Sequence, residues 1–257
     1  MKYAISRDML SNKPPSWTFE PWRKMGLTVY DKISKIPDNE ILISNHFAPW
    51  WDPLKQYIKE GRPWIEIEYA YWGDRKTTRR VTYNGHHNLK MNVRPFSRSH
   101  VFTIPQIQDW RTNSTKEYVL GILPHEEILK QRTGENLLDF QTRISSVIHQ
   151  YWNGPIIWKK KKGKQQFEAL KAQIQNAYAV VGERTMACVQ SCLLGTPAFT
   201  VDNSMTTLLM GGIENLKTLN YPDRNDWWEH ICWSQFTVEE FNSIVPAELT
   251  ERYQIEK

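Results

Sequence analysis

The apolar positions in the first half of the chain predict short strands interrupted by helices. Apolar runs that are continuous, or that alternate with polar residues, indicate strands, and here they cover residues 2–6, 27–30, 40–44 and 64–71. Apolar residues spaced three or four apart indicate helices, and they cover residues 19–25 and 53–60. This half is therefore expected to be α/β, with irregular connections.

From about residue 112 onward the alternation of strands and helices becomes regular. The predicted strands cover residues 118–123, 155–158, 177–181 and 197–201. The predicted helices cover residues 137–152, 165–175 and 185–194. Because parallel strands are joined through helical crossovers, this order predicts a parallel sheet with helices on its faces. We expect two α/β domains, at residues 1–112 and 113–257, with a hinge between Phe96 and Ser114.

The composition indicates folded domains rather than a disordered chain. Of the 257 residues, 40% are hydrophobic and 24% are charged, which suffices to form a core. The net charge of +5 is uneven, because residues 1–200 carry an excess of Lys and Arg and residues 201–257 an excess of Asp and Glu. A basic body indicates a polyanionic partner, although a basic enzyme without one has the same composition. The 12 Trp residues outnumber the 9 Phe residues, and we interpret them as core or as stacking surface.

Several classes of protein are disfavoured by features that the sequence lacks. No apolar run approaches the ~18 residues of a membrane span, and the first residues contain no signal-peptide core. The three cysteines include no Cys-x-x-Cys pair, which favours a reducing, cytoplasmic compartment over a disulfide or zinc scaffold. The common phosphate-loop, dinucleotide, serine-hydrolase and zinc-protease motifs do not occur, and neither does an Asp-x-Asp pair. We therefore expect no metal site and no cofactor.

Residues 177–201, AYAVVGERTMACVQSCLLGTPAFTV, carry the sharpest signal for a ligand site. A buried strand runs into a short turn at Gly182, and a helix begins near Arg184 and Thr185. Doubly wound domains bind ligands at this edge of the sheet, where free N–H groups and the helix dipole favour a phosphate. Arg184 would add a charge and Thr185 a hydroxyl group. An ordinary strand–helix unit with Arg184 in solvent has the same spacing.

Two further groups of cations stand near predicted strands. Lys159 and Lys161, in GPIIWKKKK, would share one face because only alternate residues of a strand do so. No Asp or Glu occurs from Arg75 to Gln108, a stretch rich in basic and aromatic residues that suits contact with a nucleic acid. The candidate DNA-binding cations are Arg75, Lys76, Arg79, Arg80, Arg94 and Arg98. A solvated basic loop is the alternative for each group.

Acidic residues lie among aromatic residues in two upstream segments. Alternation places Glu66 and Glu68 on one face of the strand predicted at 64–71. Aromatic rings beside a carboxylate disfavour its charged form and so raise its pKa toward the range of a general base. Asp52 and His46, on either side of a Trp pair, are further candidates. A purely structural role is the alternative for every one of them.

Four stretches of the chain resemble the short glycosyltransferases of tailed bacteriophages, which have the two-domain GT-B architecture. They are GPIIWKKKK, VVGERTMACVQSCLLGTPAF, IEYAYWG with RRVTYNGHH, and DRNDWWEHICWSQFTVEEF. The resemblance assigns the family's basic pair to Lys159 and Lys161, and its Ser to Thr185. Gln190 stands where the family has a Glu that holds ribose hydroxyls, and Gly154 where it has an Arg.

Upstream, the same resemblance places Glu68 at the family's Asp and Asn84 at its Asn. It implies two Rossmann-like domains, the second of which binds a nucleotide sugar, with a UDP-linked donor expected. The donor-binding residues would be Lys159, Lys161, Arg184, Thr185 and Gln190. Glu68 would be the general base, with Asp52 and His46 in reserve, and Asn84 would join the DNA-binding set.

The resemblance therefore implies a metal-independent glycosyltransferase. Its acceptor would be a hydroxymethylated pyrimidine of phage DNA, such as 5-hydroxymethylcytosine, and the enzyme would act in the host cytoplasm as a monomer without a membrane partner. Two alternatives remain open. One is a transferase of the same fold that acts on a glycan or a small molecule, and the other is a degenerate DNA-binding protein without catalysis.

Overall fold

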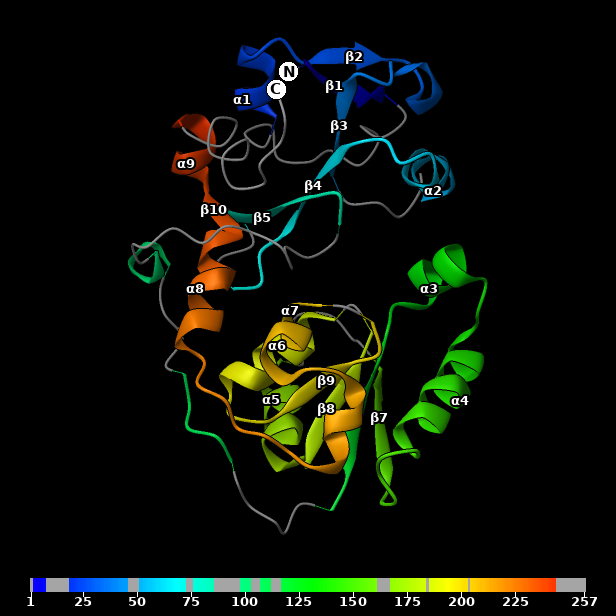
Figure 1. Cartoon of the computed structure of the whole chain (residues 1–257), viewed down its shortest axis with the longest axis vertical. Helices are drawn as coiled ribbons and strands as arrows, with labels where there is room; N and C mark the ends of the chain where they lie inside the picture. The colour runs from blue at the N-terminus through cyan, green and yellow to red at the C-terminus, as the bar shows by residue number, and fades with distance from the viewer. Residues whose placement is uncertain are drawn as a thin grey trace. The chain divides into compact units, whose positions relative to one another are not determined.

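The computed structural model divides the chain into two compact units, Met1–Thr103 with Trp228–Lys257, and Ile104–Trp227 (Figure 1). It describes residues 2–7, 19–45, 51–72, 76–85, 98–102, 107–111, 117–160, 167–183, 185–202 and 204–243. Both units are α/β, as the strand and helix pattern predicts. Each unit is considered by itself below.

The first unit is built on a six-stranded mixed sheet of order β10-β5-β4-β3-β1-β2. Its strands are β1 (Lys2–Ser6), β2 (Thr28–Tyr30), β3 (Glu40–Asn45), β4 (Trp64–Tyr69), β5 (Thr78–Tyr83) and β10 (Gln235–Thr237). Its helical segments are α1 (Glu20–Lys24), η3 (Ile33–Lys35), α2 (Trp51–Lys59), η4 (Ser99–Val101) and α9 (Val238–Ser243). The strands β2, β1, β3 and β4 run parallel, whereas β5 and β10 pair antiparallel at one side.

The two faces of this sheet are filled differently. One face is mainly apolar and packs against α1 and α9. Its core residues are Tyr3, Ile5, Phe19, Trp22, Ile41, Ile43, Ile65, Ile67, Val81, Phe236 and Phe241. The opposite face is apolar only near the amino ends of the parallel strands, where η3 and α2 cover it. That smaller cluster comprises Ala4, Ile33, Ile36, Leu42, Leu54, Tyr57 and Trp64.

The second unit contains a four-stranded parallel sheet of order β7-β6-β8-β9. Its strands are β6 (Val119–Leu123), β7 (Ile156–Lys160), β8 (Ala179–Gly182) and β9 (Ala198–Thr200). Its helical segments are α3 (Glu126–Thr133), α4 (Leu137–Ile148), α5 (Phe167–Asn176), α6 (Met186–Leu193), α7 (Met205–Met210) and η6 (Ile213–Lys217). The crossovers predicted from the sequence are therefore present, because a helix follows each of the strands in turn.

The last described part of the chain departs from the domain division expected from the sequence. The segment after Trp227 was expected to continue the second domain, but β10 pairs with β5 and thereby completes the first sheet. The helix α8 (Asn225–Trp233) leads into this strand. Because strand pairing is a long-range contact, no local pattern in residues 228–257 reveals which sheet they join.

Many of the tryptophans belong to the cores of the units. Trp22, Trp64, Trp227, Trp228 and Trp233 are all at most 5% exposed. This burial supports the core interpretation for these five residues. The three cysteines, which the sequence assigned to a reducing compartment, are unpaired and buried.

Candidate functional site

The carboxyl edge of the second sheet carries the turn that the sequence singled out. Strand β8 ends at Gly182, and α6 begins after its N-cap residue Thr185. A Cβ atom added at Gly182 would lie 2.5 Å from the methyl carbon of Thr185, so the turn requires glycine at this position. The small residue lets the start of α6 approach the end of the strand closely.

Some backbone N–H groups at the start of α6 already donate hydrogen bonds within the chain. The Thr185 hydroxyl oxygen accepts a hydrogen bond from the backbone N–H of Ala187 at 3.2 Å. The Cys188 N–H donates to the Thr185 carbonyl at 3.3 Å. The sequence suggested that the backbone N–H groups at the start of α6 are all available to a ligand, but the N-cap residue occupies one of them. The Thr185 hydroxyl keeps its own proton for donation to a ligand.

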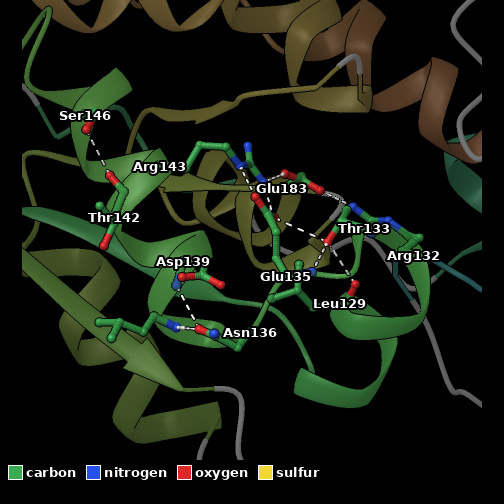
Figure 2. A network of polar contacts seen from close by, with 11 residues as sticks. Leu129, Arg132, Thr133, Glu135, Asn136, Asp139, Thr142, Arg143, Ser146 and Glu183 are labelled. Carbon is green, nitrogen blue, oxygen red and sulfur yellow. Dashed lines mark hydrogen bonds and ion pairs between the residues drawn. The ribbon is translucent and has the colours of Figure 1, made fainter.

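A charged network stands beside this turn, as Figure 2 shows. Glu183, directly after β8, pairs with Arg132 at the end of α3 and with Arg143 of α4, the latter at 3.1 Å. Arg143 also holds Glu135 through two hydrogen bonds of 2.7 and 2.8 Å. Sequence reasoning missed this network, since its four members are spread over about fifty residues and share no motif.

The network fixes two guanidinium groups at the carboxyl edge of the sheet. The Glu183 side chain is 9% exposed and that of Arg132 12%, whereas Arg143 is 41% exposed. The hydrogen bond to Glu135 is the main cause that raises the pKa of Arg143, so this residue stays cationic. The same bond lowers the pKa of Glu135. The glutamates thus balance the arginines and hold them in place.

The other expected donor-binding residues are only partly described. Lys159 lies half-buried on the edge strand β7, and Gln190 lies half-buried on α6. The neighbouring Lys160 forms an ion pair with Glu126 at 3.6 Å. Lys161 and Arg184 lie outside the described residues.

The proposed general base Glu68 lies on the first sheet, in a row of buried polar side chains. It stands opposite Arg80 of β5 in the strand register. Burial by itself lowers the pKa of Arg80, but the nearby Tyr71, Glu68 and Glu66 outweigh it and leave that pKa raised. Burial also raises the pKa of Tyr71 to about 12. Glu66 faces the same way as Glu68, as alternation predicts.

Of the two reserve candidates for the base, the structure describes only Asp52. Asp52 is exposed in the first turn of α2. His46 lies outside the described residues. The exposed position of Asp52 does not support a catalytic assignment, whereas Glu68 and His46 stay predicted candidates for the base.

Three of the arginines predicted to bind DNA are turned inward, and this corrects the sequence interpretation. Arg79, Arg80 and Arg98 are only 5%, 6% and 6% exposed. Arg79 stacks over Tyr69 at 5.2 Å from the ring centroid. The carboxylate-free stretch contains strand β5, which carries Arg79 and Arg80 and lies between β4 and β10 in the sheet. A count of charges along the chain could not reveal that strand's position.

Arg98 forms polar contacts with three residues of the C-terminal segment. Its guanidinium forms an ion pair with Glu240 at 2.6 Å. It also donates to the carbonyls of Cys232 at 3.3 Å and Gln235 at 2.9 Å. Arg98 therefore ties η4 to the segment of α8, β10 and α9 rather than offering a cation to a phosphate.

Among the remaining DNA candidates, Asn84 has a structural task. Its side-chain oxygen accepts a hydrogen bond from the Trp64 N–H at 2.9 Å, and it holds a turn with a φ of 52°. Lys76 is exposed, which agrees with a surface contact. Arg75 and Arg94 lie outside the described residues.

Comparison with known proteins adds no identification. No protein family matches the chain, and a search of curated proteins finds no match either. Within the described ranges, no group of three or more His, Cys, Asp or Glu residues could hold a metal ion. None of the described helices is long and apolar enough to cross a membrane. The fold and the site define an α/β protein with two sheets, each of which places polar groups at the carboxyl ends of parallel strands.

Proposed function

We propose that this chain is a glycosyltransferase that takes a sugar from a nucleotide-sugar donor, UDP-linked in our proposal. The observation that carries the proposal is the turn from β8 to α6, where Thr185 caps a helix at the carboxyl edge of a parallel sheet. That is the position at which open α/β sheets bind ligands. The division into two α/β units supports the GT-B-like arrangement that the sequence resemblance implies.

A nucleoside diphosphate is the ligand that this edge suits best. The positive end of α6 favours an anion, and the Thr185 hydroxyl can donate to a phosphate oxygen. Arg143, which is fixed by Glu183 and Glu135, supplies a partly exposed guanidinium of fork geometry. These groups would stabilise the negative charge that develops on the leaving diphosphate. Lys159, Lys161, Arg184 and Gln190 remain predicted contributors.

In the proposed reaction an acceptor hydroxyl oxygen forms a bond to the anomeric carbon of the sugar. The bond from that carbon to the diphosphate breaks, and the diphosphate leaves with the bonding electrons. A general base takes the hydroxyl proton, and Glu68 is our proposed base. Arg80, which lies opposite Glu68 in the register, would hold that side chain in place.

For the acceptor, hydroxymethylated pyrimidines of phage DNA remain our first proposal. It now depends on Lys76 and on Arg75 and Arg94, because Arg79, Arg80 and Arg98 are buried. That burial favours a second candidate, a transferase of the same fold that acts on an uncharged glycan or small molecule.

The test is incubation of the full chain with UDP-glucose and UDP-N-acetylglucosamine in the presence of hydroxymethylated DNA, plain DNA or free nucleosides. Mass spectrometry of the digested nucleosides then reports the acceptor and the sugar together. Transfer to hydroxymethylated DNA alone supports DNA as the acceptor. Transfer that does not depend on DNA supports a glycan or small-molecule acceptor. The absence of transfer to any acceptor, together with no calorimetric binding of UDP, would sink the transferase proposal.

A pair of Thr185 variants separates donor binding from folding. Thr185→Ser keeps both the cap and the hydroxyl and should keep UDP affinity. Thr185→Val removes both, and we expect UDP affinity to fall about tenfold or more. Asn136→Ala is the matched control, because Asn136 caps α4 through Leu138 and Asp139 and its loss should leave UDP affinity unchanged.

A further inference from the structure

The first sheet contains a polar row that the proposed donor site does not use. On the face covered by α2, the apolar residues Ala4, Leu42 and Trp64 occupy the amino-terminal halves of β1, β3 and β4. Two residues further along each strand, the same face carries Ser6, Ser44 and Glu66. The row continues across β5 and β10 with Arg80, Thr82 and Gln235, and along β4 with Glu68.

This row is deeply buried, which makes its polarity unusual for a sheet interior. Ser6, Ser44, Glu66, Thr82 and Gln235 are all 0% exposed. The opposite face at the same level is filled by isoleucine and valine. Burying polar groups costs free energy unless each finds a hydrogen-bond partner. Packing alone would therefore favour apolar residues here as well.

Several atoms of the row lack a partner. Within the part of the chain that the structure describes, no hydrogen-bond partner is found for Ser6 Oγ, Ser44 Oγ, Gln235 Nε2 or Arg80 Nε. Gln235 Oε1, by contrast, accepts a hydrogen bond from the Trp72 N–H at 2.8 Å, so that side chain is held in one orientation. The unsatisfied hydroxyls and N–H groups come from four different strands and lie on one sheet face.

The row also lies at the position where open sheets bind their ligands. The strand β1 pairs with β2 on one side and with β3 on the other. The chain order therefore reverses beside β1, and open sheets bind ligands at the carboxyl ends of the strands at such a switch point. Ser6 and Ser44 lie at those ends, because β1 stops at Ser6 and β3 at Asn45.

We propose that this polar row is a second ligand site, which takes an uncharged compound bearing several hydroxyl or amide groups. Glu66 and Glu68 against the single Arg80 make the row formally negative, which disfavours phosphates and carboxylates. The serine hydroxyls, the Gln235 amide and the glutamates offer both donors and acceptors, as a sugar or a nucleoside requires. Because the row is buried, the ligand enters through a local opening and associates more slowly than by diffusion.

The test measures the melting temperature of the full chain with and without glucose and 5-hydroxymethyl-2′-deoxycytidine at millimolar concentration. We expect one of these probes to raise the melting temperature, and which one does so distinguishes a sugar from a nucleoside. Its phosphorylated form, glucose 6-phosphate or the nucleoside 5′-monophosphate, should bind more weakly. If neither uncharged probe raises the melting temperature, or if the phosphorylated form binds better, the proposal is overturned.

Two serine variants distinguish a ligand site from a structural one. Ser44→Ala removes an unpartnered hydroxyl, so the melting temperature without probe should stay or rise while the probe's affinity falls about tenfold. Ser234→Ala is the matched control, because Ser234 is equally buried but donates to the His230 carbonyl at 2.9 Å. It should lower the melting temperature and keep the probe's affinity. The opposite pattern would contradict the proposal.

This inference rests in part on the proposed function, because the row contains Glu68, the proposed general base, and a ligand in the row would be the acceptor. Ser44→Ala should leave the calorimetric binding of UDP unchanged, since UDP is assigned to the second unit. A chain that binds an uncharged probe without binding UDP would retain this site and lose the proposed function. If the chain binds UDP but Ser44→Ala leaves the probe's affinity intact, the donor site of the proposed function is retained and the proposed second site is lost.

Discussion

Replacing Arg98 with methionine separates a structural arginine from a DNA-binding one. Methionine fills much of the same volume but removes the ion pair to Glu240 and the two bonds to the carbonyls of Cys232 and Gln235. Removing one partner of a buried ion pair costs ~3–5 kcal/mol. Because Glu240 is only 13% exposed and the carbonyls lose a charged donor, we expect a loss of about 4 kcal/mol.

The assay is equilibrium unfolding in urea, followed by circular dichroism. With a slope of ~2–3 kcal/mol per molar urea, this loss lowers the unfolding midpoint by roughly 1.3–2 M. Lys76→Ala is the control from the same basic stretch, and because Lys76 is exposed its change should stay within ~0.5 kcal/mol. DNA binding, measured at matched fractions of folded protein, should be unchanged in Arg98→Met. If this variant keeps its midpoint while its affinity for DNA drops, the structural assignment of Arg98 is refuted.

Three further predictions concern the second unit. Gly195→Ala should destabilise the chain strongly, because Gly195 has a φ of +79° and an added Cβ would lie 2.1 Å from the Asp109 carbonyl oxygen; thermal unfolding within about 1 °C of wild type would contradict this. The lowered pKa of Glu135, caused first by its hydrogen bond to Arg143, contributes stability above its ordinary pKa that is lost as pH falls through the lowered value. Glu135→Gln should therefore flatten the acid limb of a stability-against-pH curve, and an unaltered limb would disprove the assignment. Burial raises the pKa of the Cys192 thiol to about 12, so iodoacetamide at pH 8 should label it only after unfolding, as peptide mass spectrometry can check; rapid labelling of the folded chain would show that the thiol is accessible.

Much of the architecture follows from local patterns. The strands at 2–6, 40–44 and 118–123 and the helices at 53–60 and 185–194 all form close to their expected positions. These elements were predictable because the spacing of apolar residues within a short segment indicates whether that segment forms a strand or a helix. The turn at Gly182 also follows from the sequence, because a buried strand followed by a glycine and a capping Thr predicts a tight turn into a helix.

The candidate sites were less predictable, because they depend on pairing between distant segments. The turn at Gly182 was visible in the sequence, but the link of the next residue, Glu183, to Arg132 and Arg143 arises only when α3 and α4 pack beside the end of β8. The polar row likewise needs the register of five strands to bring Ser6, Ser44 and Gln235 onto one sheet face. Single serines of this kind carry no signal in a sequence.

By itself the sequence determined the α/β class, the parallel order of the second half and the strand-to-helix turn at Gly182, because these depend on local periodicity and local backbone geometry. Tertiary structure alone decided the fate of the charges. Arg79, Arg80 and Arg98 resemble part of a DNA-binding surface along the chain, but all three are buried, the first two on β5 between β4 and β10 and Arg98 against Glu240. The sequence gives the charge of each side chain, whereas the packing of distant segments determines whether that side chain is exposed to solvent.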